Sequence, residues 1–320
     1  MKKIAILTSG GDAPGMNPAV RAVARMAISR GMEVVGVTHG YNGLMNAEFV
    51  DFNLRSVSDI IHRGGTMLYS ARSPEFKTEA GMQKAIDSCK AHGIEGIVVI
   101  GGDGSFRGAR DLSLRGIPCV GIPATIDNDI ACTDYTIGFD TALNTSMQTI
   151  DRLRDTSQSH DRCAVVEVMG RGCGDLALQV GIAVGATAII VPEVPYDIEH
   201  DIIDRIHRAQ KTNKRHYIIV VAEGVGGAQN IAKRIEEQTG IESRATILGH
   251  IQRGGSPTLR DRLVASKMGI HAVELLEQGI GNRVVALIDN SITDLDIFEA
   301  LQQKRTFDTE LYKNAHDISI

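Results

Sequence analysis

Short runs of aliphatic and β-branched residues alternate along the chain with longer segments of helical periodicity. In the longer segments apolar residues recur three and four positions apart, which is typical of helices with one buried face. Strands that alternate with such helices predict an α/β protein in which parallel sheets are covered by helices on both faces. The runs expected to form strands are residues 3–7, 97–100, 119–122, 164–168, 188–191, 217–222, 244–248 and 284–288.

The first predicted strand is followed by a glycine-rich turn and then by a helix. Asn17 is expected to cap this helix and Pro18 to occupy its first turn, where a missing backbone donor costs nothing. The same order recurs after residues 97–100, where Gly101–Gly104 precedes a helix that is expected to stop at Gly116. The sequence therefore places two glycine turns at the carboxyl ends of two strands.

The chain is long enough for two domains. At about 150 residues per domain, 320 residues correspond to roughly two, and the predicted strands fit two sheets better than one. An amphipathic segment from Asp140 to about Ser157 is expected to link the lobes, and we place a boundary near Gly138. No Pro-rich or Gly/Ser-rich linker separates them, so we expect the lobes to pack closely.

Composition and charge narrow the class of protein. Hydrophobic residues make up 43% of the chain and charged residues 23%, which is ordinary for a folded globular protein. The 34 Lys and Arg against 39 Asp and Glu give a net charge of −5, which argues against a broad nucleic-acid-binding surface. An anionic ligand must then be bound by local groups of cations.

The sequence also bears on location. No apolar run approaches the roughly 20 residues needed to cross a bilayer, so we expect no membrane association. Lys2 and Lys3 precede only four apolar residues, too few for a secretory signal. The five cysteines are odd in number and contain no CxxC pair, which indicates reduced packing residues rather than disulfides or a zinc site. We therefore expect a cytoplasmic protein.

The two glycine turns are candidate phosphate sites. In a doubly wound sheet, ligands bind beyond the carboxyl ends of the strands, where the segments Thr8–Asp12 and Gly101–Ser105 are expected. Glycines let backbone N–H groups approach phosphate oxygens, and a helix N-terminus favours their negative charge. Either loop alone is more often a plain tight turn. Two such loops, each with an aspartate, favour a bound phosphate chain, and Asp103 offers the carboxylate that Mg²⁺ commonly uses beside nucleotide oxygens.

A third loop, Pro123–Asp129, follows directly after the strand predicted at residues 119–122. Asp127 and Asp129 stand two positions apart, so one carboxylate can accept a hydroxyl proton while the other assists with orientation or a metal. A solvated Asx turn is the alternative. Beside a glycine loop, this pattern favours phosphoryl transfer to an alcohol.

Several arginines lie in or next to loops rich in glycine or hydroxyl groups, where a guanidinium group can bind phosphate oxygens. Each of them alone can equally be a surface ion-pairing residue. His250 can bond a sugar hydroxyl or serve a structural role. The arginines are Arg72, Arg162, Arg171, Arg244 and Arg253.

Five longer motifs stand in order along essentially the whole chain. They are LTSGGDAPGMN (Leu7–Asn17), VVIGGDGS (Val98–Ser105), TIDND (Thr125–Asp129), VEVMGR (Val166–Arg171) and LGHIQRGGSP (Leu248–Pro257). Together they resemble the motifs of the bacterial ATP-dependent 6-phosphofructokinases. The resemblance implies a glycolytic kinase that transfers the γ-phosphoryl group of MgATP to the 1-hydroxyl of fructose 6-phosphate, and it implies a homotetramer whose active sites are shared between subunits.

The same resemblance implies two Rossmann-like lobes, each a mainly parallel sheet flanked by helices. It assigns residues 1–138 and about 252–305 to a nucleotide-binding lobe. It assigns residues 139–251 and about 306–320 to a sugar-phosphate-binding lobe.

The resemblance further implies roles for individual residues. Asp127 would be the general base and Asp103 the magnesium ligand. Thr125, Asp129, Arg171, Arg72 and Gly11 would complete the catalytic set. ATP would be bound by Gly11, Tyr41, Arg72, Ser73, Gly102, Asp103, Gly104, Ser105 and Gly108. The sugar phosphate would be bound by Thr125, Asp127, Arg162, Met169, Gly170, Arg171, Glu223, Arg244, His250 and Arg253, with Arg162 and Arg244 supplied by a neighbouring subunit.

Two positions bear on the phosphoryl donor. ATP users of this family usually have a glycine where this chain has Ala124. Pyrophosphate users have a lysine at that position and an aspartate where this chain has Gly104. Because Ala124 leaves the space that a lysine would fill, ATP remains the favoured donor.

The family's effector site for ADP or phosphoenolpyruvate is only partly matched. Thr187 stands where a magnesium-binding glutamate is usual, Thr212 stands near a usual arginine, and Leu54 replaces a basic residue of some members. We therefore expect weak allosteric regulation. The residues that still match are Arg21, Arg25, Arg154, Gly185 and Lys214.

Three alternatives stay open at this point. The first is a pyrophosphate-dependent enzyme of the same family. The second is a nicotinamide-dependent oxidoreductase, based on the loose dinucleotide fingerprint Gly172-x-Gly174-x-x-Ala177. The third is a non-catalytic sugar-phosphate sensor, against which the presence of Asp127 argues.

Overall fold

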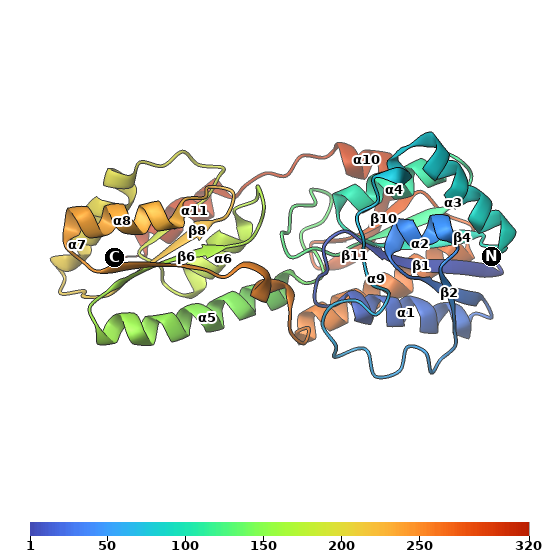
Figure 1. Ribbon diagram of the computed structural model, residues 1–320, viewed down its shortest axis with the longest axis horizontal. Helices are drawn as coiled ribbons and strands as arrows, with labels where there is room; N and C mark the ends of the chain where they lie inside the picture. The colour runs from blue at the N-terminus through green and yellow to red at the C-terminus, as the bar shows by residue number, and fades with distance from the viewer. Residues whose placement is uncertain (320) are drawn as a thin grey trace. The chain divides into compact units, whose positions relative to one another are not determined.

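The computed structural model describes residues 1–319, which form two compact units (Figure 1). The first unit contains residues 1–126, 130–141 and 253–305, and the second contains 127–129, 142–252 and 306–319. These ranges lie close to the expected lobes, except that Asp127–Asp129 belong to the second unit. Every helix among the described residues is too short or too polar to span a bilayer.

The first unit is built on a seven-stranded sheet in the order β11-β10-β5-β4-β1-β2-β3. Its five inner strands are parallel, and the edge strands β3 and β11 run antiparallel to their neighbours. This confirms the predicted α/β class with a mainly parallel sheet. The strands are β1 (Lys3–Ser9), β2 (Glu33–Val37), β3 (Phe49–Phe52), β4 (Gly96–Gly101), β5 (Cys119–Pro123), β10 (Arg283–Ile288) and β11 (Ser291–Asp296).

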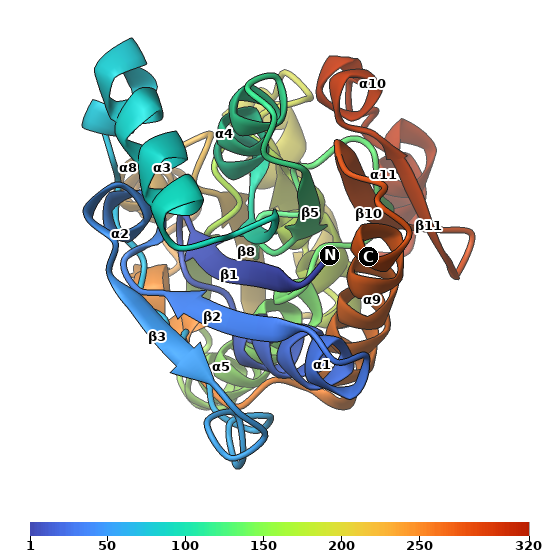
Figure 2. The same ribbon diagram turned by 90° about the vertical axis from the view of Figure 1, so that its right-hand side faces the viewer.

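Helices cover both faces of this sheet. Helices α1 and α9 pack against each other on one face, while α3, α4 and α10 lie on the other (Figure 2). The buried strand residues alternate between the two faces, as the period of two requires. The helices are α1 (Met16–Ser29), α2 (Gly40–Asn46), α3 (Glu79–Ala91), α4 (Asp103–Ser113), α9 (Leu259–Glu277) and α10 (Ile297–Gln302), with a 3-10 turn, η1 (Glu75–Lys77).

The second unit has a four-stranded, fully parallel sheet in the order β7-β8-β6-β9. Helices α7 and α8 pack on the face that contains Val165 and Ile219, and α6 contacts β7 and β8. The strands are β6 (Cys163–Val168), β7 (Ala188–Ile190), β8 (Tyr217–Ala222) and β9 (Ser243–Ile247). The helices are α5 (Phe139–Ser159), whose first turn belongs to the first unit, α6 (Asp175–Ala183), η2 (Glu199–Ile203), α7 (Asp204–Gln210), α8 (Ala228–Thr239), η3 (Gly249–Arg253) and α11 (Thr309–Asp317).

Every strand predicted from the sequence is present, with ends that shift by one or two residues. The predicted cap at Asn17 is wrong, because α1 begins at Met16 and Gly15, at φ +108°, takes the cap position. The Asn17 side chain instead donates to the Arg63 and Gly64 carbonyls and accepts from the Met67 backbone N–H. The helix expected to stop at Gly116 already ends at Ser113.

The core of the first unit gives a matched pair of substitutions at the end of α4. Leu112 is fully buried, whereas Leu114, the C-cap residue, is 64% exposed. Leu112→Ala is expected to lower the free energy of unfolding by about 2–5 kcal/mol, because it removes buried methyl groups and leaves a cavity. Leu114→Ala should change it by less than about 0.5 kcal/mol. Urea unfolding followed by circular dichroism measures both, and equal effects would contradict this assignment of the core.

Candidate functional site

The two glycine loops lie side by side at the carboxyl edge of the first sheet. Strands β1 and β4 pair in parallel with Ser9 opposite Gly101, so the loops that follow them leave the sheet together. The chain continues from β1 to β2 on one side, whereas β4 lies on the other, which makes this pair the point where the strand order reverses. Ligands of open α/β sheets bind in the crevice at such a point.

The glycines of these loops are of two kinds. A Cβ atom on Gly101 would lie 2.4 Å from the Ser9 carbonyl oxygen, so the close approach of the two loops requires glycine there. A Cβ atom on Gly102 or Gly104 would meet no atom within 4 Å. These two glycines are therefore not needed for packing within the chain, and their backbone at the start of α4 is open to a ligand.

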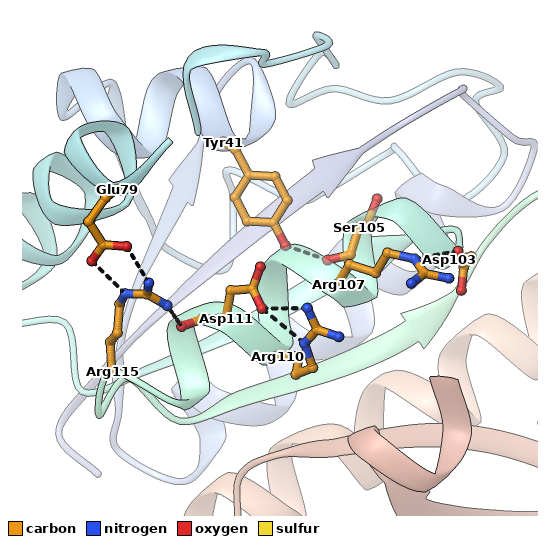
Figure 3. A network of polar contacts seen from close by, with 8 residues as sticks. All are labelled: Tyr41, Glu79, Asp103, Ser105, Arg107, Arg110, Asp111 and Arg115. Carbon is orange, nitrogen blue, oxygen red and sulfur yellow. Dashed lines mark hydrogen bonds and ion pairs between the residues drawn. The ribbon is translucent and has the colours of Figure 1, made fainter. Parts of the chain in front are cut away.

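Asp103 is the first residue of α4. Its carboxylate is about half exposed and accepts a 2.9 Å hydrogen bond from Arg107 Nε, one turn further along (Figure 3). Within residues 1–319 no three His, Cys, Asp or Glu side chains gather as they would around a metal held by protein alone. A metal at Asp103 would thus need ligand oxygens from a bound phosphate chain.

Tyr41 packs against the second glycine loop. Its buried ring stacks on that of Phe76, with 4.0 Å between the ring centroids. Its hydroxyl donates a 2.5 Å hydrogen bond to the Ser105 carbonyl oxygen (Figure 3). Burial raises the pKa of the Tyr41 hydroxyl well above its usual value, so the group stays a donor. Gly108 makes room for the ring, because a Cβ atom there would lie 2.7 Å from it. In the isolated chain Tyr41 therefore positions the loop.

The loop that contains Arg72 runs beside the first glycine loop. Ser70 Oγ donates a 2.5 Å hydrogen bond to the Gly10 carbonyl oxygen, and the Arg72 carbonyl accepts from Asn42. The Arg72 side chain is exposed, and Ser73 Oγ accepts from the Phe76 backbone N–H. An open pocket of about 490 Å³ lies beside the two loops and is lined by Gly10, Gly11, Asp12, His39, Thr66, Tyr69 and Ser70.

Arg253 lies against the first glycine loop. Its Nη1 donates to the Asp12 carbonyl oxygen at 3.0 Å, and a Cβ atom on Gly11 would be 2.6 Å from the same nitrogen. The resemblance to the family assigns Arg253 to the sugar phosphate. In the structure its guanidinium group lies beside Gly11 and Asp12, in the first glycine loop, which is a candidate phosphate site.

In the second unit one arginine lies near both carboxylates of the third loop. Arg171 Nε is 3.6 Å from Asp127 Oδ2, and its Nη1 is 3.8 Å from Asp129 Oδ2. The Asp127 side chain is only 2% exposed, whereas that of Arg171 is 69% exposed. Arg171 has φ +57°, an uncommon conformation for a residue other than glycine, and its backbone N–H donates to Glu223 Oε1 at 2.6 Å.

The neighbouring residues of this group are fixed by polar side chains. Gly170 has φ +133°, and a Cβ atom there would lie 2.5 Å from the Cys173 carbonyl oxygen. The Met169 backbone N–H donates to Gln252 Oε1 at 3.2 Å. Gln252 is fully buried and was missed by the sequence reasoning, although it lies in a motif between His250 and Arg253.

Arg162 and Arg244 meet at a third residue that the sequence did not single out. Glu242 accepts hydrogen bonds from Arg162 Nε and Arg244 Nη2, each at 2.7 Å. These bonds hold the pKa of Glu242 below its usual value, with that from Arg162 having the largest effect. A single glutamate forms no recognisable motif, so only the pairing of β6 with β9 reveals this arrangement.

Thr125 belongs to the first unit, where its carbonyl accepts a hydrogen bond from Thr136 Oγ1 at 2.7 Å.

The residues matched to an effector site divide between the units. Arg21 and Arg25 lie on α1 of the first unit. In the second unit Arg154 donates to the Val184 carbonyl oxygen next to Gly185, and burial and the charge of Arg154 lower the pKa of Lys214. Thr187 is fully buried, and Thr212 Oγ1 donates to the Ala209 carbonyl oxygen.

The loose dinucleotide fingerprint has a structural explanation. A Cβ atom on Gly174 would lie 2.6 Å from Val191 Cβ, so this glycine is needed for packing. The Gly174 backbone N–H, at the start of α6, donates to Glu193 Oε1 at 2.7 Å. A carboxylate of the chain thus occupies the position that a pyrophosphate would take, which argues against a nicotinamide cofactor here.

Comparisons with known proteins agree with the motif pattern. Residues 3–276 match the family model described as Phosphofructokinase. Proteins called ATP-dependent 6-phosphofructokinase from Brevibacillus brevis and Bacillus cytotoxicus are each 56% identical over 320 residues, which is all of both chains.

Solved structures are similar as well. Phosphofructokinase from Saccharomyces cerevisiae has a TM-score of 0.90 and 34% identity, and the match covers all of this chain and 48% of the yeast chain. The chain thus spans about half the length of that relative. A pyrophosphate-dependent phosphofructokinase from Marinobacter aquaeolei has a TM-score of 0.87 at 22% identity, covering 100% of this chain and 92% of that one, which shows a shared fold.

The two kinds of glycine in α4 predict stability effects of opposite sign. Gly108→Ala is expected to lower the free energy of unfolding by about 1–3 kcal/mol, because the new methyl group collides with the Tyr41 ring. Gly104→Ala meets open space within the helix and should raise it by up to about 1 kcal/mol. Thermal denaturation measures both changes. A Gly108→Ala protein as stable as Gly104→Ala would contradict the proposed contact with Tyr41.

Proposed function

Since the chain belongs to the phosphofructokinase family, we propose that it is an ATP-dependent 6-phosphofructokinase, which transfers the γ-phosphoryl group of ATP to the 1-hydroxyl of fructose 6-phosphate. Relatives with that name are 56% identical over the full length. The single observation that supports the proposal best is the pair of glycine loops at the β1–β4 edge, where Gly102 and Gly104 leave the start of α4 open.

ATP rather than pyrophosphate is the proposed donor. Ala124 is fully buried, and its backbone N–H donates to the Gly101 carbonyl oxygen, so no cation stands at this position. Gly104 likewise leaves the start of α4 without an additional carboxylate. The triphosphate chain of ATP would therefore meet no charged side chain at position 124 or 104.

The test is a donor assay with purified protein. Formation of fructose 1,6-bisphosphate is measured with ATP and with pyrophosphate at equal concentrations, and we expect turnover only with ATP. Turnover with pyrophosphate alone would assign the chain to the other branch of the family. Absence of turnover with both donors would favour a sugar-phosphate sensor.

Asp127 is the proposed general base. Its carboxylate is almost completely buried, and the guanidinium group of Arg171 at 3.6 Å compensates the negative charge. In the proposed step the 1-hydroxyl oxygen forms the new P–O bond, its proton passes to Asp127, and ADP leaves with the electrons of the broken bond. Arg171 also lies beside Asp129 and orients the two carboxylates with respect to each other.

Asp103 fits the chemistry of a magnesium ligand. It offers one partly exposed carboxylate at a helix N-terminus, the kind of single protein ligand that Mg²⁺ uses together with nucleotide oxygens. Bound Mg²⁺ would neutralise part of the charge of the phosphate chain. Arg107 holds the carboxylate through one oxygen.

A homotetramer with shared active sites is proposed for the sugar phosphate. Arg162 and Arg244 are both tied to Glu242 beside β9, which is an edge strand of its sheet. Two preorganised guanidinium groups at an edge suit a phosphate bound by a neighbouring subunit. Sedimentation analysis tests the oligomeric state, for which we expect four copies. The location that we propose is the cytoplasm, where glycolysis takes place.

Replacement of the proposed base has a defined kinetic effect. Asp127→Ser is expected to lower kcat by about 10²- to 10⁴-fold, because no positioned group then accepts the hydroxyl proton. The KM for fructose 6-phosphate should change much less. Asp87→Ser, at an exposed position of α3, is the matched control and should keep the original kcat. A variant of Asp127 that retains kcat at saturating substrates would rule out the assignment.

The effector response is expected to be weak. Thr187 is buried and Thr212 is bonded to the chain, so neither offers the charge that the usual glutamate and arginine provide. An effector shifts a two-state enzyme only through its differential affinity for the two states, and fewer contacts reduce that difference. The measurement is the initial rate at subsaturating fructose 6-phosphate during titration with phosphoenolpyruvate and with ADP. Strong inhibition at micromolar phosphoenolpyruvate would contradict the expectation.

A further inference from the structure

Asp261 is a buried carboxylate in the first turn of α9, outside the residues assigned above. Its Oδ1 accepts hydrogen bonds from the Tyr135 hydroxyl and, at 2.7 Å, from the Gly138 backbone N–H. Its Oδ2 accepts from the backbone N–H of Thr141, at 2.9 Å, and from the Thr141 hydroxyl. Four donors of one short segment thus converge on a single carboxylate.

The segment held in this way, residues 135–141, includes the first turn of α5 and the loop before it. One side of this segment packs against Ala13 and Gly15, which follow the first glycine loop. A Cβ atom on Gly138, at φ +103°, would lie 2.7 Å from Ala13 Cβ, and a Cβ atom on Gly15 would lie 2.5 Å from Ile137 Cγ2. The segment is therefore in close contact with the chain directly after Gly10–Asp12.

The other side of the segment holds the chain that leads to Asp127. The Ile137 backbone N–H donates to the Pro123 carbonyl oxygen at 3.0 Å, and Thr136 Oγ1 donates to the Thr125 carbonyl oxygen at 2.7 Å. Ala124 and Ile137 also form a parallel β-bridge. The carboxylate of Asp261 thus fixes a segment that contacts both the end of the first glycine loop and the start of the loop with Asp127.

We propose that Asp261 is a positioning residue for phosphoryl transfer, which sets the Pro123–Thr125 chain relative to the Gly10–Asp12 loop through residues 135–141. This inference rests on the proposed function. Residues Gly10–Asp12 and Pro123–Thr125 both lie in the first unit, and Asp127 follows two positions after Thr125. Small displacements of reacting groups lower the rate. The role needs a carboxylate, because only a carboxylate presents two acceptor oxygens and no donor to four converging hydrogens.

The test compares Asp261→Asn with a control of the same chemistry. The amide keeps the shape of the side chain but turns an NH₂ group toward donors of residues 135–141. Asp296→Asn is the control, because Asp296 caps α10 of the same unit and accepts from the Phe298 and Glu299 backbone N–H groups. Values of kcat and of KM for both substrates are measured per folded protein, at a temperature where circular dichroism shows each variant fully native.

The expected result for Asp261→Asn is a kcat at least about tenfold lower, with the KM for ATP within about twofold of the original. Asp296→Asn should keep kcat even where it lowers the melting temperature. A kcat per folded protein that is unchanged in Asp261→Asn, or that falls equally in the control, would overturn the inference. So would an effect confined to the KM for ATP.

A second variant keeps the inference testable if Asp261→Asn does not fold. Tyr135→Phe removes one of the four donors and retains the ring, which Arg260 covers at 4.5 Å. Its kcat is expected to fall by about threefold or more, and an unchanged kcat would overturn the inference. The unmodified chain is assayed alongside: without ATP-dependent turnover the proposed function fails and this inference with it, whereas turnover unaffected by the variants refutes this inference alone.

Discussion

The parallel pairing of β1 with β4 is the contact on which the rest of the first unit depends. With Ser9 opposite Gly101, the two strands end together and their glycine loops emerge at one edge. The loops approach so closely that Gly101 has no room for a side chain. The same register places the start of α4 at the edge where the loop before α1 also begins. A shift in this register would separate the loops.

In the second unit the main constraint is a buried negative charge. The carboxylate of Asp127 is almost wholly removed from solvent, yet the guanidinium group of Arg171 lies 3.6 Å away and also near Asp129. Arg171 reaches this position with a positive φ that Glu223 secures through the backbone N–H. Glu242 gathers Arg162 and Arg244 by the same principle of paired charge. The unit thus holds its charged groups in place before any ligand arrives.

The sequence predicted those features that depend on residues close to one another along the chain. The strands, both glycine turns and the long helix from residue 139 follow from hydrophobic period and glycine placement, and the motifs located the three loops. Three strands were not predicted. The edge strands β3 and β11 are interrupted by polar residues, as in FVDF and SITDLD, and the inner strand β2, EVVGV, is short and contains a glycine. Asn17 looked like a helix cap, but a loop fifty residues further along engages its side chain. Asp261, Gln252 and Glu242 act through partners distant in the sequence, so no local pattern marks them.

The division of the first unit into three stretches of chain has a consequence for folding during synthesis. Helix α1 packs against α9, and the sheet that begins with β1 is completed only by β10 and β11. The strands of the second unit's sheet, within residues 163–247, lie between these stretches and are synthesised before α9. Until α9 is made, the part of the sheet face that α9 covers stays exposed, and exposed apolar surface favours aggregation. The pace at which residues 253–305 are translated, and the chaperones present at that moment, then govern how much native protein a cell obtains.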